Sequence, residues 1–123
     1  MQNLRLNEAI NKLDVLVFLK DFSIEEEVTR ITRDSPGLAP GDAERLLRLV
    51  RSVRNSDKEF RIGPVPHPLG KHKDFAKVPT FELSEKCFRL QKWADCLCRQ
   101  FPEVEPEIVN RVIRRYVYLR HLR

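Results

Sequence analysis

The sequence predicts an all-α fold, a single domain of about five helices spanning residues 1–123, from three observations. Apolar residues recur at three- and four-residue steps through most of the chain, which is the spacing of an amphipathic helix. All four glycines and all eight prolines fall within residues 36–41, 63–79 and 102–106, so little else interrupts a helix. A chain of 123 residues, 41% of them hydrophobic, can fill one core without metals or disulfides.

The first two helices are expected over residues 4–22 and 24–33. In the first, the run 15–19 is apolar on all sides, which indicates a buried helix end, with a short buried strand as the alternative. Ser23 and Glu26 form an S-x-x-E capping box at the start of the second helix. The Ser-Pro-Gly sequence at 35–37 ends that helix.

The third helix is expected over residues 43–55, with Asp42 as its N-cap. Its apolar side faces the core, and Arg45, Arg48, Arg51 and Arg54 follow one another along its edge. Residues 56–79 have no helical period and contain four prolines. They predict a long, irregular, proline-rich connection, which is usually either functional or a linker.

The last two helices are expected over residues 84–101 and 107–121. Ser84 or Thr80 is the N-cap of the fourth helix, and Pro106 occupies the first position of the fifth, where a missing amide costs nothing. Because the turn between them is short, the two helices are expected to form an antiparallel hairpin at the C-terminus.

The strongest functional candidate is the basic side of the last helix. Residues 107–123 carry a net charge of +4, five arginines less one glutamate, out of +5 for the whole chain. At about 100° per residue, one side of this helix is apolar. The other side carries Arg111, Arg114, Arg115, Tyr118 and His121. We expect a negatively charged partner to dock here, although cations near a helix C-terminus are also favoured without any function.

One arginine of the last helix breaks this separation, since Arg120 falls in the apolar arc. Two explanations are open at this point. Either the helix frays at Arg120, or the chain continues beyond Arg123 in a longer parent protein.

Three further features are secondary candidates for partner binding. The ridge of Arg45, Arg48 and Arg51 is usually a solvated helix edge, and phosphate contact is the alternative. Trp93, on the flank of the fourth helix, is expected to be partly buried under the connection or to be an interface anchor. The segment 64–70, with Pro66 and Leu69, resembles a polyproline-type stretch that packs on its own helices or docks in a partner's groove.

Catalytic and metal sites are not indicated by the sequence, and no cofactor is expected. Cys87, Cys96 and Cys98 are an odd number of cysteines, which favours free thiols in a reducing compartment. His67 and His72 have a spacing that fits zinc loosely, but Cys96 and Cys98 point to opposite sides of a helix, which argues against a zinc site. The four glycines are isolated in turns, which excludes a glycine-rich phosphate loop.

The sequence therefore predicts a non-catalytic, intracellular protein-interaction or scaffold domain, part of a nuclear complex and cut from a longer protein. Its partner is expected to be a protein with an acidic segment. The alternative is a nucleic-acid-binding domain that uses the arginines of the third and fifth helices. A membrane location is not expected, because the longest apolar stretch has five residues against about twenty needed to span a bilayer.

Overall fold

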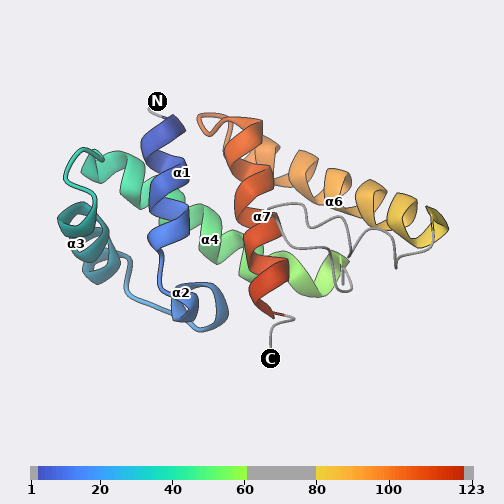
Figure 1. The fold of residues 1–123 in the computed structure, drawn as a ribbon, viewed down its shortest axis with the longest axis horizontal. Coiled ribbons are helices and arrows are strands. Elements are labelled where there is room, and N and C mark those ends of the chain that lie inside the picture. The colour runs from blue at the N-terminus through green and yellow to red at the C-terminus, as the bar shows by residue number, and fades with distance from the viewer. Residues whose placement is uncertain (1–2, 61–79, 121–123) are drawn as a thin grey trace.

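The computed structural model describes the backbone of residues 3–60 and 80–120 and the side chains of residues 6–60 and 88–120. Within these ranges the chain forms six α-helices and no strand (Figure 1). They are α1 (Asn3–Lys12), α2 (Val15–Leu19), α3 (Ile24–Asp34), α4 (Pro40–Phe60), α6 (Thr80–Gln100) and α7 (Pro106–Arg120). The all-α fold class is confirmed.

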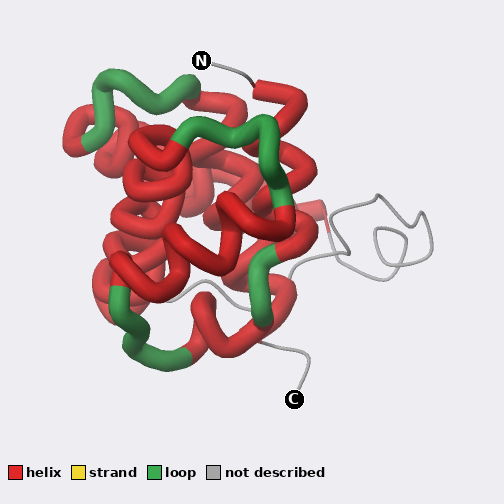
Figure 2. The backbone as a smooth tube through the Cα atoms, turned by 90° about the vertical axis from the view of Figure 1, so that its left-hand side faces the viewer, coloured by secondary structure: helices red, strands yellow, loops and turns green. Residues whose placement is uncertain are grey.

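The helices are arranged around α4 and α7. In Figure 1, α1 and α7 run side by side across α4, α3 packs near the start of α4, and α6 leads into α7 through residues 101–105. α6 and α7 pack against each other, so the predicted C-terminal hairpin is confirmed, although their axes cross and the start of α6 extends away from α7 (Figure 1). Figure 2 shows that short loops join the helices on either side of α3.

A single hydrophobic cluster runs through all six helices. Its largest fully buried side chains include Phe18 of α2, Leu47 of α4, Trp93 of α6 and Ile113 of α7. α7 contributes Ile108, Val109, Val112, Ile113, Tyr116, Val117 and Leu119, and it contacts α1, α2, α4 and α6. One face of α7 is therefore committed to the core, as its amphipathic pattern predicts.

The predicted first helix, residues 4–22, is wrong in two respects: it is two helices, and the second of them ends at Leu19. α1 ends at Lys12, and the Asp14 side chain accepts a hydrogen bond from the Leu16 amide at 3.0 Å, which caps α2. In α2 only Val17 and Phe18 are buried, whereas Val15 and Leu16 are 41% and 53% exposed. The run 15–19 is thus neither a strand nor a helix end buried on all sides.

The second predicted helix agrees with α3 to within one residue. The Ser23 hydroxyl accepts a hydrogen bond from the Glu26 amide at 3.4 Å, as the capping box requires. The fifth predicted helix likewise corresponds to α7, with Pro106 at its first position. Both helices carry a stop or start signal in the local sequence, which is why their limits could be predicted.

The third and fourth predicted helices are too short. α4 begins at Pro40 instead of residue 43 and continues to Phe60 instead of residue 55. Asp42 is therefore not an N-cap but lies in the first turn, where its carboxylate binds Arg45 at 3.2 Å. α6 begins at Thr80 instead of residue 84. The predicted connection 56–79 is consequently reduced to residues 61–79, which lie outside the described residues.

The added turn of α4 is held by contacts to α6 and α7. The Ser56 hydroxyl accepts a hydrogen bond from the Trp93 indole at 2.7 Å, and the Phe60 ring stacks on that of Trp93 with centroids 5.4 Å apart. Asp57 forms an ion pair with Arg120 of α7. Because two of these three α4 residues are polar, the helix has no visible apolar period here, although all three face other helices.

The Asp57–Arg120 pair explains the arginine in the apolar arc of α7. Arg120 remains helical, and its guanidinium lies over the Tyr116 ring, 5.8 Å from the centroid, while it binds the Asp57 carboxylate. The two charged side chains are only 25% and 20% exposed. Fraying of the helix is therefore not the reason for its position.

Tyr116 is expected to make the fold sensitive to alkaline pH. Burial, followed by the nearby Asp57 carboxylate, raises the pKa of Tyr116 to about 12, from about 10 in an unfolded chain. A raised pKa means that the folded state holds the proton more tightly, so this contribution is complete below about pH 10 and is lost as the pH rises through about 12. Denaturant unfolding measured across this interval should show the loss.

The control for this pH effect is Tyr116→Phe, which cannot ionise. It should remove the tyrosine-dependent part of the decline and leave the part due to other groups. Tyrosinate absorbance in a Tyr118→Phe variant reports Tyr116 alone, because the chain has two tyrosines. Ionisation near pH 10 in the folded variant would contradict the raised pKa.

Candidate interaction surface on α7

The α7 basic face, defined here as Arg111, Arg114 and Arg115, lies opposite the buried side of α7. Arg111 and Arg114 are exposed, and Arg115 is half-buried. Tyr118 lies on the same side and is half-buried against the core, whereas His121 lies outside the described residues. The structure therefore brings four of the five predicted residues to one side of one helix.

The charges of this face are not neutralised by the rest of the described chain. Arg111 and Arg114 form no ion pair within the described ranges. The Nε of Arg115 is buried and has no hydrogen-bond partner among the described residues. The exposed guanidinium groups of Arg111 and Arg114 can donate hydrogen bonds to an acceptor supplied from outside. The α7 basic face is thus suited to carboxylate or phosphate oxygens.

The arginines of α4 differ because each has a partner within the chain. Arg45 binds Asp42 at 3.2 Å, and Arg48 binds Glu44 at 3.0 Å, both within the helix. Arg51 donates to the Phe22 carbonyl and lies 4.9 Å from the centroid of the Phe22 ring. Arg45 and Arg48 thus lie on a solvated helix edge, as predicted, with side chains 50% and 58% exposed, whereas Arg51 makes a tertiary contact.

Arg54 completes the contact between α4 and the segment that precedes α3. It donates to the Lys20 carbonyl, and its guanidinium binds the Asp21 carboxylate at 3.0 Å. A hydrogen bond from the Phe22 backbone, followed by the bond from Arg54, holds the pKa of Asp21 below its usual range. This role could not be predicted from the local sequence, because the partners lie about thirty residues away.

The remaining secondary candidates do not add to the α7 basic face. Trp93 is fully buried, contacts Phe60 and Tyr116, and donates to Ser56, so its predicted role as an interface anchor and its predicted partial burial are both wrong. Its flank position on α6 is covered because α4 is longer than expected and α7 lies across it. Pro66 and Leu69 lie outside the described residues.

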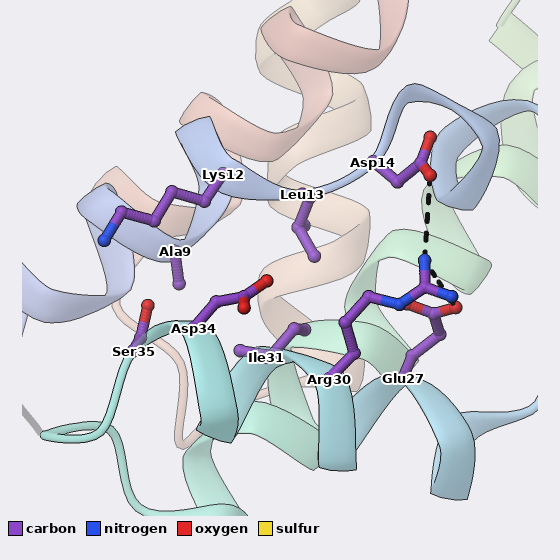
Figure 3. Close-up of a pocket in the computed structure, with 9 residues that line it drawn as sticks. All are labelled: Ala9, Lys12, Leu13, Asp14, Glu27, Arg30, Ile31, Asp34 and Ser35. Atoms are coloured by element: carbon purple, nitrogen blue, oxygen red, sulfur yellow. Dashed lines mark ion pairs between the residues drawn. The ribbon is translucent and has the colours of Figure 1, made fainter.

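A small charged cavity lies between the α1–α2 junction and α3 (Figure 3). Arg30 bridges Asp14 at 3.6 Å and the buried Glu27 at 3.5 Å, which ties the start of α2 to α3. The cavity measures about 10 Å³, which is room for about one water molecule. Its charged side chains therefore stabilise a helix junction and leave no space for a substrate.

Cys96 and Cys98 are free thiols, each half-buried. Burial, followed by the Asp95 carboxylate, raises the pKa of the Cys98 thiol, which lowers its reactivity at neutral pH. Cys98 packs against the core, as its place in the apolar stripe predicts. The side chain of Cys87 is outside the described set. Among the described residues, no group of three or more histidines, cysteines and acids could hold a metal ion.

None of the described helices is both long and apolar enough to cross a membrane. No family model matches the chain, and no curated protein or solved structure matches it significantly. The α7 basic face is therefore the candidate site on the strength of its own geometry.

Proposed function

We propose that this chain is a non-catalytic protein-interaction or scaffold domain that binds an acidic segment of a partner protein through the α7 basic face. One observation carries the proposal: Arg111 and Arg114 are exposed and have no ion-pair partner in the described ranges, whereas the four α4 arginines are held by neighbours in the fold. Positive charge that the fold does not use is available to a partner.

The size of the face favours an acidic peptide over nucleic acid. Arg111 and Arg115 are four residues apart, which is about 6 Å along a helix. Such a span reaches one or two carboxylates, whereas specific duplex binding commonly involves about 6–10 phosphate contacts. Tyr118 is half-buried against the core and offers only part of its ring for stacking on a base. Nucleic acid is the second candidate because the α4 arginines, on which that alternative also depends, already have partners within the chain.

A nuclear, intracellular location is part of the same proposal. The net charge of +5 favours anionic partners, which are abundant there. The location of the fluorescently tagged chain in cells tests it, and exclusion from the nucleus would overturn this part without affecting the binding surface.

Reversing the two exposed arginines, Arg111→Glu with Arg114→Glu, is expected to abolish capture of an acidic partner. Exposed charges contribute about 1 kcal/mol or less to folding, so the melting temperature should barely change. Fluorescence anisotropy with a labelled polyglutamate peptide should show affinity falling by about tenfold or more, which corresponds to about 1.4 kcal/mol.

The matched control is Arg33→Glu with Arg99→Glu, which makes the same change in net charge on exposed arginines of α3 and α6. Equal loss of binding in both variants would show a general charge effect and would contradict the assignment. Tighter binding to a single-stranded oligonucleotide, lost steeply with salt and with Tyr118→Ala, would replace the acidic peptide by nucleic acid.

A further inference from the structure

A second surface of opposite charge lies where α3 meets α4. The α3–α4 groove is lined by Ile24, Glu25, Val28, Pro40, Gly41 and Glu44, and its open cavity measures about 360 Å³. None of these residues belongs to the α7 basic face or to the cavity of Figure 3. The groove lies between the first turns of α3 and α4, two helices that pack against each other.

The lining combines an apolar floor with acidic walls. Ile24 and Val28 are half-buried hydrophobic residues one helical turn apart, and Pro40 faces them from α4. Glu25 stands on the α3 wall and forms no ion pair within the described ranges. Glu44 stands on the α4 wall and binds Arg48 at its outer side, at 3.0 Å.

Compensation of the α3 dipole accounts for acidic residues at its start, but not for the groove between them. An apolar floor beside the Glu25 carboxylate is complementary to an aliphatic side chain with a neighbouring cation. An open groove of this size suits a short stretch of extended or helical peptide.

We propose that the α3–α4 groove docks a short basic peptide segment of a partner protein. One aliphatic side chain of that segment packs on Ile24, Val28 and Pro40, and a flanking lysine or arginine pairs with Glu25, which forms no ion pair within the described ranges. The groove lies apart from the α7 basic face and has the opposite charge, so one domain would hold an acidic and a basic segment at once.

Gly41 provides a way to close the groove without disturbing the fold. A Cβ built at Gly41 meets no other atom within 4 Å, so a larger side chain has room there. Gly41→Leu is expected to fill the groove. Gly41→Ala is the matched control, because it leaves most of the groove open and favours the helix by about 1 kcal/mol.

The experiment uses the isotopically labelled chain and a short capped peptide with one leucine between lysine pairs. We expect amide shifts confined to residues 24–28 and 40–44. Affinity should fall about tenfold or more with Gly41→Leu and change little with Gly41→Ala. Glu25→Lys should also weaken binding, whereas Glu26→Lys, the same charge change at an exposed neighbour outside the lining, should retain it.

Several outcomes would overturn the proposal. The groove is not a peptide site if the leucine–lysine peptide causes no shifts there, or if replacing its leucine by serine leaves the affinity unchanged. Shifts at residues 24–28 that grow with protein concentration and without peptide would assign the groove to a second copy. The Arg111→Glu, Arg114→Glu variant should bind the basic peptide normally, so failure at either surface is distinguishable from failure at the other.

Discussion

Replacing Trp93 by alanine is expected to lower the free energy of unfolding by about 3–5 kcal/mol, the range for deleting a buried aromatic side chain. Trp93 is fully buried, stacks on Phe60 and meets the edge of Tyr116 with centroids 6.1 Å apart. Its removal would leave a void between three helices, while the Ser56 hydroxyl would keep its hydrogen bond to the Ser52 carbonyl at 2.7 Å. Urea unfolding followed by far-ultraviolet circular dichroism measures the change.

Two milder variants separate packing from hydrogen bonding at this position. Trp93→Phe keeps an aromatic ring against Phe60 but loses the indole donor, and Ser56→Ala removes the acceptor. Ser56→Ala leaves the buried indole N–H without an acceptor and should cost about 1–3 kcal/mol. Trp93→Phe leaves no polar group unpaired, because the Ser56 hydroxyl still donates to the Ser52 carbonyl, so its cost reports the lost ring volume. An unfolding midpoint unchanged by Trp93→Ala would mean that the ring is at the surface, and would restore its predicted role as an interface anchor.

Asp57→Ala is expected to destabilise the fold by about 2–3 kcal/mol. Removing one partner of a fully buried ion pair costs about 3–5 kcal/mol. The Asp57–Arg120 pair is one-fifth to one-quarter exposed, so solvent lowers that figure. The variant leaves the Arg120 guanidinium over the Tyr116 ring without its carboxylate. Denaturant unfolding at neutral pH gives the measurement.

The companion variant removes both charges, Asp57→Leu with Arg120→Met. A hydrophobic pair of similar volume often matches a buried ion pair in stability, so the double variant should be more stable than Asp57→Ala alone. A double-mutant cycle with Asp57→Leu and Arg120→Met as the single variants then isolates the coupling between the two residues. A coupling near zero would show that Arg120 is held by the tyrosine ring and not by Asp57.

Local signals in the sequence were sufficient for α3, α7 and the α7 basic face. A capping box marks the start of α3 and a Ser-Pro-Gly sequence marks its end. A proline marks the start of α7, so these three helix limits depend on neighbouring residues alone. Which α7 residues are exposed follows from the helical period, because the opposite face is apolar. Arg111 and Arg114 could therefore be placed correctly without any knowledge of the neighbouring helices.

The features that the sequence did not reveal depend on partners far along the chain. The last turn of α4 contains Ser56 and Asp57, polar residues whose partners are 37 and 63 residues away. Arg54 binds an aspartate 33 residues earlier, and Arg51 a carbonyl 29 residues earlier. Hydrophobic periodicity assigns such polar residues to the solvent side of a helix. The predicted third helix was therefore too short, and its arginines were predicted to be solvated. The α3–α4 groove was missed because it is made by two helices together.

The central place of α7 has a consequence for how the chain folds during synthesis. α7 contacts four helices that precede it in the chain. Until residues 106–120 have emerged from the ribosome, apolar surface on α1, α2, α4 and α6 therefore remains exposed to water. Contacts between α1 and α7 close a loop of nearly the whole length described, and such distant contacts slow folding. Uncovered apolar surface of this kind promotes aggregation and recruits chaperones. α7, which carries the α7 basic face, is therefore also the helix whose emergence from the ribosome allows the core to be completed.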